Sequence, residues 1–468
     1  MNTIINKIKN DIILNTILTN TTEQIYLVGG TIRDFYLNKK SYDRDIIITS
    51  SDARKFSIKM ANILDATFVS LDEDNKIYRL VLSDKINYID ITNPIANSLE
   101  KDLQRRDLTM NAITINLKTY EIVDLCDGIS DLENKIIKAI SEKNLIDDPL
   151  RLLRIFRFMS NLGFEIEAKT LDMIKMNKEK INEPARERVN YELMKLFSGK
   201  YVAETLTQMN EIGILSEIFP IVSELKQVPP NTHHHLRLLE HSIETVNQIE
   251  IIYNNSTNEV KTHLDEKIIA GFSRISYLKL AGFLHDIGKF STWTIEEETN
   301  RHRFMKHEEV GSKLVVALLK KLNFSNKQIE HIAKLIKNHI YPSQVVSTED
   351  LSEKIMMRYI RKMEDESIDA IILAQADRLS ARGVDVSDMM VEKNISSLDI
   401  LLNFYLKIRK TLEPLAKLLS GTEVMEILQI KPSKELGQTM LALNEAQISG
   451  DIITKNDAIN FIKSLKSL

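Results

Sequence analysis

The stretch YLVGGTIRDFYLNKKSYDRDIIIT, residues 26–49, combines aliphatic runs with a glycine pair and with two aspartates that stand two positions apart. The runs on either side of the central polar segment have the length and residue types of short β-strands. Successive strand side chains alternate between two faces, so Asp43 and Asp45 point to one side while Ile46 and Ile48 point toward the core. Converging carboxylates are hard oxygen ligands suited to Mg²⁺, and the stretch therefore predicts a metal site on one strand.

The glycine pair, Gly29 and Gly30, follows the first strand and precedes a helical pattern. Glycines at such a corner let main-chain N–H groups approach phosphate oxygens, and Arg33 can add a bidentate grip. Two plainer interpretations stay open, because paired acids also occur on solvated strand edges and paired glycines in ordinary turns. Asp90, in the run INYIDIT, is either a third acid of the site or a solvent-facing residue.

Composition limits the class of protein. The chain has 468 residues, 43% of them hydrophobic, which predicts several domains. A formal net charge of −4 gives no overall basic field, so any site for a polyanion must be local. A single cysteine, Cys126, favours a reducing compartment, and no apolar run is long enough for a membrane span; both predict a cytoplasmic protein.

The hydrophobic pattern changes along the chain. Strand-like runs alternate with helical stretches up to about residue 125, and helical spacing dominates from about residue 130 onward. The proline-marked segment LKQVPPNTHHHLRL indicates a further boundary. The pattern thus predicts a mixed α/β block followed by helical segments. Together with the motif resemblances of this chain, it implies an α+β protein in four parts, a head with a mixed sheet and three helical segments: residues 1–130, 131–225, 226–400 and 401–468.

The stretch DDPLRLLRIFRF carries arginines at every third position, Arg151, Arg154 and Arg157. Asp148 followed by Pro149 has the pattern of a helix N-cap. The arginines share one helix face, and the apolar residues between them indicate an enclosed helix. Enclosed guanidinium groups need acidic or hydrogen-bonding partners, although a solvated face would show the same spacing.

A second group of polar residues is spread over the helical half: His241, the adjacent pair His285 and Asp286, and Asp377. Mixed imidazole and carboxylate ligands suit Mn, Fe, Ni, Co or Zn better than Ca²⁺. The histidine triplet at residues 233–235 lies in the proline-marked segment and is expected to be exposed.

The motifs LVGGTIRD, DRDI, DLQRRDLTMNAI, DGISDL, DDPLRLLRIFRF and ERVNYELMKLFSG, taken in this order, resemble the class II tRNA nucleotidyltransferase and poly(A) polymerase family. The resemblance implies a polymerase-β-like head, with Asp43 and Asp45 as catalytic ligands of Mg²⁺, followed by a helical neck and body. It also implies a set of nucleotide-binding residues: Gly29, Gly30, Arg33, Arg106, Asp107, Asn111, Asp148, Arg151, Arg154 and Arg157.

In this family Asp148 and Arg151 correspond to an amino-acid template. A carboxylate accepts from the amino group of cytosine or adenine while a guanidinium donates to the ring acceptor, so uracil and guanine are rejected. The implied reaction is attack of a tRNA 3′-hydroxyl on CTP or ATP, with contacts to the acceptor stem and the 3′ end. The chain passes from YIDIT to Arg105 without the long polar loop of many CCA-adding relatives, which resembles members that add only CC; CC and CCA addition both stay open.

The order His241, His285-Asp286, Asp377, with HDIGK at its centre, resembles the HD phosphohydrolase superfamily. The positions of His307 and His339 match those that bring a second metal ion in some members. The resemblance implies a phosphatase or cyclic phosphodiesterase activity or a purely structural role, and the last 68 residues resemble a helical RNA-binding tail.

Three alternatives remain at this point. A poly(A) polymerase shares the head and neck motifs. An HD phosphohydrolase could use the head only to bind RNA. The third alternative is a non-catalytic RNA-binding module, but the sequence lacks the stripes of basic and aromatic residues that would support it. The oligomeric state is not predicted.

Overall fold

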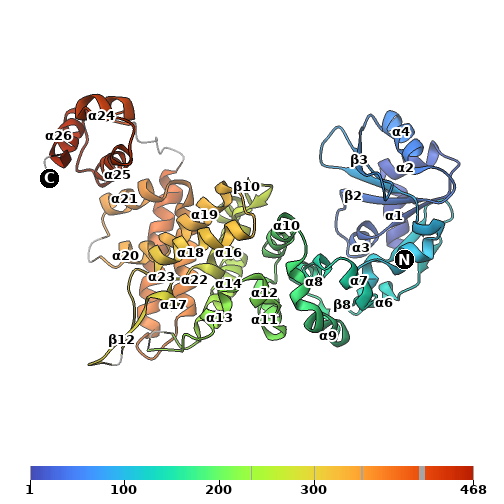
Figure 1. Ribbon diagram of the computed structural model, residues 1–468, viewed down its shortest axis with the longest axis horizontal. Coiled ribbons are helices and arrows are strands. Elements are labelled where there is room, and N and C mark those ends of the chain that lie inside the picture. The colour runs from blue at the N-terminus through green and yellow to red at the C-terminus, as the bar shows by residue number, and fades with distance from the viewer. Residues whose placement is uncertain (1, 233, 300, 349–350, 410–416, 467–468) are drawn as a thin grey trace. The chain divides into compact units, whose positions relative to one another are not determined.

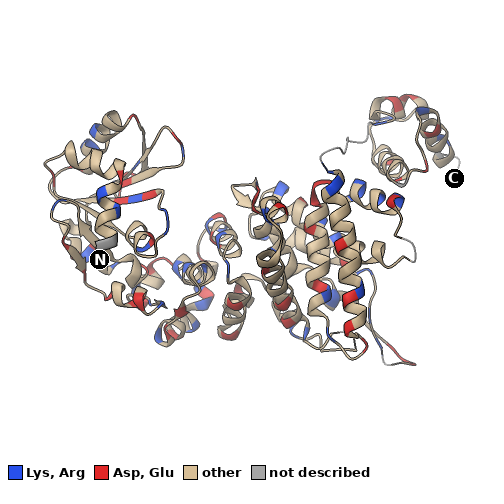
Figure 2. Ribbon diagram, turned by 180° about the vertical axis from the view of Figure 1, so that it is seen from behind, with Lys and Arg blue, Asp and Glu red and all other residues tan. Residues whose placement is uncertain are grey.

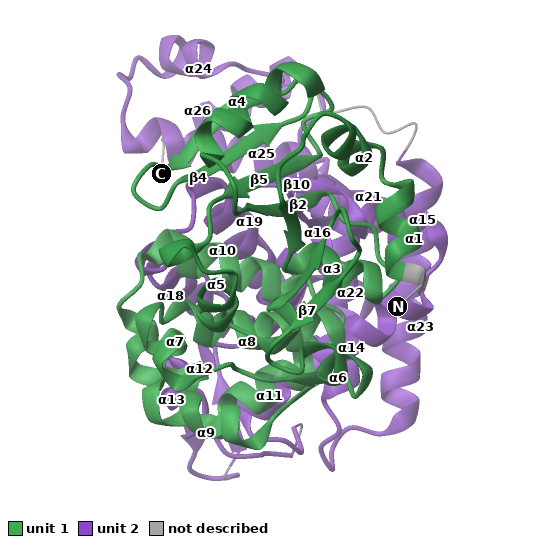
Figure 3. Cartoon of the chain, turned by 90° about the vertical axis from the view of Figure 1, so that its right-hand side faces the viewer, with its two compact units in different colours: residues 1–220 green, residues 221–468 purple. Residues whose placement is uncertain are grey.

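The computed structural model describes residues 2–232, 234–299, 301–348, 351–409 and 417–466. The chain divides into two compact units, unit 1 at residues 1–220 and unit 2 at residues 221–468 (Figure 3). The finer division into four parts stays a prediction.

Unit 1 begins with one mixed β-sheet in the order β3-β4-β5-β2-β1-β6-β7 (Figure 1). Its strands are β1 (Ile25–Val28), β2 (Asp43–Ile48), β3 (Thr67–Asp72), β4 (Ile77–Val81), β5 (Tyr88–Thr92), β6 (Ile113–Asn116) and β7 (Ile122–Asp124). Strand β2 lies in the middle, antiparallel to β1 and parallel to β5. The predicted head with a mixed sheet is confirmed.

Helices cover this sheet: α1 (Asn2–Asn10), α2 (Ile12–Thr19), α3 (Gly30–Tyr36), α4 (Ala53–Leu64), α5 (Leu99–Gln104) and α6 (Gly128–Glu133). Helix α4 packs over β3, β4 and β5, and α3 packs on β1 and β2. Ile46, Ile47 and Ile48 are all fully buried. The alternation predicted for β2 therefore holds only for its first half, because Ile47 packs against Leu103 of α5 and the strand is covered on both faces.

The rest of unit 1 is helical: α7 (Glu142–Asp147), α8 (Leu150–Leu162), α9 (Ala168–Asn177), α10 (Arg186–Phe197), α11 (Val202–Ile212) and α12 (Ile214–Ile218), with the short strands β8 (Ile136–Ile137) and β9 (Glu165–Ile166). Helices α8 and α10 pack closely together. Gly163 ends α8 in the left-handed conformation, with φ 66°. The α8–α10 pair presents the predicted arginines to the sheet.

Unit 2 is built on α14 (Leu238–Asn255), α16 (Arg274–Leu284), α18 (His307–Lys321), α19 (Asn326–Lys337) and α22 (Ser367–Ser380). Around them lie α13 (Val222–Leu225), α15 (Asn258–Asp265), α17 (Lys289–Thr292), α20 (Tyr341–Val346), α21 (Glu353–Met363), α23 (Asp388–Ile408) and the hairpins β10 (Lys267–Ile269) with β11 (Phe272–Ser273) and β12 (Trp293–Glu296) with β13 (Arg301–Phe304). Helix α16 is buried along its whole length, and its two basic residues, Arg274 and Lys279, are paired with Asp369 and Glu250.

The last helices of unit 2, α24 (Gly421–Leu428), α25 (Lys434–Ser449) and α26 (Lys455–Lys466), pack around a small core of their own. Basic and acidic residues are interspersed along the ribbon of both units (Figure 2). Among the described helices, none is both long and apolar enough to cross a bilayer.

Candidate functional site

Three carboxylates converge on one side of the sheet of unit 1. Carboxylate oxygens of Asp43, Asp45 and Asp90 lie within 4.8 Å of one another. Asp43 and Asp45 point to the same side of β2, as predicted from their spacing. The parallel pairing of β2 with β5 sets Asp90 directly beside Asp45. Arg79 of β4 holds Asp90 from the other side, with both donor distances at 2.7 Å.

The surroundings of this cluster favour a cation. Burial raises the pKa of Asp45 to about 7, and the nearby carboxylates Asp43 and Asp90 add to the rise although Arg106 opposes it. Burial and Asp90 also raise the pKa of Asp43. Among the described residues, neither Asp43 nor Asp45 has an ion-pair partner, whereas Asp90 is paired with Arg79. Crowded carboxylate oxygens, two of them on residues with no ion-pair partner among the described residues, fit Mg²⁺.

The glycine corner allows two charged side chains to approach the main chain. Gly29 has a φ of 80°, and a Cβ atom added there would lie 2.9 Å from Nη1 of Arg106 and 3.0 Å from Oδ2 of Asp45. A larger residue would displace one or both of them. Gly30 then begins α3. The glycine pair therefore brings a helix start, Arg106 and Asp45 together.

Arg33 is engaged inside unit 1. Its Nη2 lies 2.8 Å from Oδ1 of Asp34, and its Nη1 donates to Oδ1 of Asn111 at 2.7 Å. Nδ2 of Asn111 in turn donates to Oδ1 of Asp107 at 3.0 Å. The guanidinium of Arg33 also lies 4.8 Å from the ring centroid of Phe158. These contacts place Arg33 and Asn111 one step away from the cavity, where they support Asp107.

The prediction that the neck arginines have acidic or hydrogen-bonding partners is confirmed. Arg154 reaches Asp107 at 2.7 Å and Glu192 at 3.8 Å, and Arg157 reaches Glu192 at 3.2 Å. Burial alone would raise the pKa of Asp107, but Arg154 and Asn111 hold it below its usual value. The ion pairs therefore join the segment after α5, which carries Asp107, to α8, and join α8 to α10. Glu192 was not singled out in the sequence.

Asp148 and Arg151 do not contact each other directly. Both carboxylate oxygens of Asp148 accept from Nη2 of Arg188 on α10, at 3.0 and 3.3 Å. Nη1 of Arg151 instead donates to the main-chain oxygens of Arg105 and Asn144, at 2.7 and 3.0 Å. The predicted N-cap is wrong, because the side chain of Asp148 turns to Arg188 and makes no cap to α8. Arg188 was not predicted to belong to the site.

A cavity of about 500 Å³ in unit 1 connects these groups. Its lining includes Asp45 and Asp90 as well as Asp148, Arg151 and Arg188. Arg106, Asp107, Arg154 and Tyr191 also line it. One cavity therefore contains two groups of side chains. Asp45 and Asp90 are suited to a metal ion, whereas Asp148, Arg151 and Arg188 are suited to hydrogen bonds with the edge of a nucleotide base.

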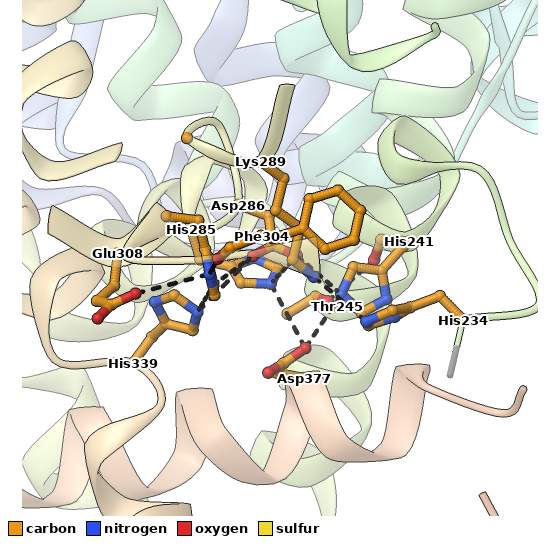
Figure 4. A network of polar contacts seen from close by, with 12 residues as sticks. His234, His241, Thr245, His285, Asp286, Lys289, Phe304, Glu308, His339 and Asp377 are labelled. Atoms are coloured by element: carbon orange, nitrogen blue, oxygen red, sulfur yellow. Dashed lines mark hydrogen bonds and ion pairs between the residues drawn. The ribbon is translucent and has the colours of Figure 1, made fainter. Parts of the chain in front are cut away.

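A second cluster lies inside unit 2, where all four predicted ligands meet (Figure 4). Nε2 of His241, on α14, lies 3.0 Å from Oδ1 of Asp377 on α22 and 3.4 Å from Oδ2 of Asp286. Nε2 of His285 lies 3.1 Å from Oδ2 of Asp286 and 3.5 Å from Oδ1 of Asp377. The pair His285-Asp286 follows the C-terminal end of the buried helix α16.

His307 and His339 extend the cluster. Nε2 of His307 lies 3.3 Å from Oδ1 of Asp286, and Nε2 of His339 lies 3.7 Å from the same oxygen. Asp286 therefore stands between two sets of imidazole groups. Gly288 of the HDIGK motif permits this arrangement, because a Cβ atom there would lie 2.1 Å from the main-chain oxygen of His307.

The histidine rings are oriented by the main chain. Nδ1 of His285, His307 and His339 lies 2.8, 2.9 and 2.7 Å from the carbonyl oxygen three residues earlier in each case. A carbonyl oxygen only accepts, so Nδ1 carries a hydrogen and Nε2 is the ring nitrogen that faces the cluster. This is the arrangement of metal-ligating histidines with an outer hydrogen-bond partner.

The polar atoms of this cluster fit a metal ion. Buried nitrogen and oxygen atoms of His241, His285 and Asp286 lack a hydrogen-bond partner of good geometry among the described residues. Burial lowers the pKa of His339 to about 3, which keeps its imidazole neutral as a metal ligand must be. Burial alone would lower the pKa of His285, but Asp286 and Asp377 raise it to about 10, so the site attracts positive charge.

His234 corrects the expectation that the histidine triplet is exposed. Its ring centroid lies 4.5 Å from that of His241, and its Nε2 lies 3.2 Å from Nζ of Lys289. Burial and Lys289 lower its pKa to about 2. His235 is exposed, and His233 lies outside the described residues. The local pattern could not reveal that the loop folds back onto α14.

Comparison with family models gives three matches. Residues 25–138 match the poly A polymerase head domain, residues 163–226 match the probable RNA and SrmB- binding site of polymerase A, and residues 238–382 match the HD domain. The first match contains the glycine corner and the three carboxylates. The last contains the whole histidine and aspartate cluster.

Curated relatives match over nearly the full length. The CC-adding tRNA nucleotidyltransferase of Thermus thermophilus is 29% identical over 449 residues, with 94% of each chain covered. The A-adding tRNA nucleotidyltransferase of Deinococcus radiodurans is 28% identical, with 93% of this chain and 94% of the relative covered. Among solved structures, the CCA-adding enzyme of Thermotoga maritima complexed with tRNA has a TM-score of 0.59 at 19% identity, with 98% of this chain and 97% of that one covered, and shares the fold.

Proposed function

The chain belongs to the tRNA nucleotidyltransferase and poly(A) polymerase family, and we propose that it adds C, or C and A, to the 3′ end of tRNA from CTP and ATP with release of pyrophosphate. One observation carries the proposal: the carboxylates of Asp45 and Asp90 and the base-reading candidates Asp148 and Arg151 line the same cavity. A nucleotide bound there would have its triphosphate at the carboxylates and its base at α8.

The reaction joins the RNA 3′-oxygen to the α-phosphorus of the nucleotide and breaks the bond from that phosphorus to the pyrophosphate oxygen. Mg²⁺ bound by Asp43 and Asp45 would lower the pKa of the attacking hydroxyl and neutralise the leaving pyrophosphate. Arg106, held beside Gly29, contributes positive charge next to the same carboxylates. The remaining contribution of the protein is to hold both substrates in line.

Base selection would depend on Asp148 and Arg151. In this state Asp148 is bound to Arg188, so an amino group of cytosine or adenine must replace that guanidinium. A base that presents an acceptor to Asp148 cannot do so. The selection thus includes an exchange of partners at Asp148.

Replacing Arg188 by glutamine is expected to lower the KM for CTP by about 1.4-fold to fivefold, because an exposed ion pair contributes about 0.2–1 kcal/mol that CTP binding must otherwise overcome. Steady-state kinetics with saturating tRNA would measure the change. Arg186→Gln on the same helix is the matched control, since Arg186 bonds Asn182 instead. A higher KM for CTP in Arg188→Gln would show that Arg188 binds the nucleotide and would contradict the exchange.

Replacing Arg151 by alanine is expected to relax the choice of base. In the unaltered protein the guanidinium of Arg151 would face a ring N–H of uracil or guanine, so two donors would meet without an acceptor. Such unpaired groups cost about 1–3 kcal/mol, which corresponds to roughly 5- to 150-fold discrimination against these bases. The ratio of kcat/KM for CTP to that for UTP measures this. Arg151→Lys keeps the charge and controls for its loss. An unchanged ratio in Arg151→Ala would remove Arg151 from base selection.

The number and kind of nucleotides added depend on the segment that follows β5. Residues 93–98 are all that separate β5 from α5, where CCA-adding relatives often have a long polar loop. This favours addition of CC without A. Pure protein with Mg²⁺ and tRNA lacking its CCA end would be given CTP and ATP, singly and together. Growth by two residues with CTP alone, and no further growth with ATP, is expected; no growth would refute the proposed function.

The cluster in unit 2 favours a second function, a metal-dependent phosphohydrolase acting on phosphate esters or on 2′,3′-cyclic phosphate ends. The converging ligands His241, His285, Asp286 and Asp377, together with His307 and His339, support it. A transition-metal ion bound there would activate water. Release of phosphate from such substrates after loading with Mn²⁺, Ni²⁺ or Co²⁺ is the test.

A further inference from the structure

Helix α10 carries three exposed or half-exposed side chains in a row, and two of them line the cavity of unit 1. Arg188, Tyr191 and Lys195 stand three and four positions apart, so they share one face of the helix. The side chain of Tyr191 is 51% exposed, although the helix also buries Leu193 and Leu196. Tyr191 and Arg188 both line the cavity.

This row runs between the two ends of the cavity. Arg188 contacts Asp148, the base-reading candidate. One turn further, Tyr191 lies under Lys195, whose Nζ is 4.3 Å from the ring centroid. The positive charge of Lys195 also interacts electrostatically with the carboxylate of Asp43. Tyr191 and Lys195 thus lie between the base-reading end and the carboxylates.

We propose that Tyr191 and Lys195 bind the 3′-terminal nucleotide of the RNA, with its base stacked on the tyrosine ring and its phosphate at the lysine. The proposal rests on the proposed function. The attacking 3′-hydroxyl must reach the carboxylates while the incoming base reaches Asp148, so the terminal nucleotide has to pass along α10. An aromatic ring next to a basic residue is the arrangement that binds single-stranded nucleic acid without reading its sequence.

Tyr191→Ala in the full chain is expected to raise the KM for tRNA about 5- to 150-fold, because stacking on an aromatic side chain contributes about 1–3 kcal/mol per base. The KM for CTP should change by less than about twofold, and Tyr191→Trp should retain most of the RNA affinity. Tyr120→Ala is the matched control, because Tyr120 also has a lysine over its ring, with Nζ of Lys9 at 4.9 Å from the centroid.

A binding measurement separates this proposal from the proposed function. Fluorescence anisotropy in the Asp43→Asn background would compare two tRNAs that differ only in the base of the 3′-terminal nucleotide, which is present in one RNA and missing from the abasic end of the other. Tyr191→Ala should weaken binding of the RNA with the base several-fold and leave binding of the abasic RNA unchanged. Equal effects on both RNAs, or no effect on either, would overturn the proposal. A raised KM for CTP alone would also overturn it, by placing the incoming base on the ring. Failure of the proposed function would appear separately, as no addition by the unaltered protein.

Discussion

Replacing Asp45 by asparagine is expected to reduce nucleotide addition by roughly 10³-fold or more, because the metal ions of such a site supply several kcal/mol of transition-state stabilisation. Asparagine keeps the shape of the side chain and removes the charge that holds the cation. Asp43→Asn should have the same effect. Single-turnover incorporation of CTP into tRNA measures the loss directly.

The same substitution should not destabilise the fold. Asp45 lies among Asp43 and Asp90, and burial raises its pKa to about 7, so loss of its charge relieves repulsion. We expect a melting temperature equal to or above that of the unaltered protein. Asp72→Asn, at the end of edge strand β3, is the control that should leave addition unchanged. Full addition by Asp45→Asn would show that the carboxylate cluster is not the metal site.

Replacing Asp286 by asparagine is expected to abolish phosphohydrolase activity and to leave nucleotide addition within about twofold. Asp286 is the residue shared by both ligand sets of unit 2, with oxygens 3.1 Å from His285 and 3.3 Å from His307. Loss of this bridging charge should lower the hydrolytic rate roughly 10³-fold, and the protein should lose its bound metal ion. Release of phosphate from 2′,3′-cyclic ends and elemental analysis of the purified protein are the two measurements.

The exposed residue His235 supplies the control, because His235→Gln changes a histidine near this site that is turned to solvent. It should keep both metal content and hydrolysis. Unchanged metal content in Asp286→Asn would refute the assignment of the ligands. Parallel loss of nucleotide addition would instead contradict the independence of the two activities.

Much of the unit 1 site could be predicted from local sequence. The period of a strand is sufficient to put Asp43 and Asp45 on one side, and the apolar filling of α8 is sufficient to predict that its arginines have acidic or hydrogen-bonding partners. The order of the histidines and aspartates likewise predicted the cluster of unit 2. Each of these inferences depends on spacing within one element or on a resemblance carried by quoted motifs.

The features of the two sites that the sequence did not predict depend on contacts between separate helices, strands and loops. Asp90 joins the carboxylates because β5 pairs in parallel with β2, and no residue pattern reveals which strands become neighbours. Arg188 reaches Asp148 across 40 positions of sequence, so the pattern at Asp148 predicted a helix cap instead. His234 was expected in solvent because its segment is polar and contains prolines, yet it packs on His241.

The sequence by itself determined the kind of chemistry, since the carboxylates, the glycine corner, the arginines and the histidine ligands are identified by residue type, by spacing and by the resemblance of their motifs to known families. Tertiary structure decided how these groups are paired: Asp90 with Arg79, Asp148 with Arg188, and Asp286 between two sets of histidines. The physical reason is that spacing within a strand or helix follows from fixed backbone periods. The partner of a charged side chain depends instead on which elements pack together to bury apolar surface.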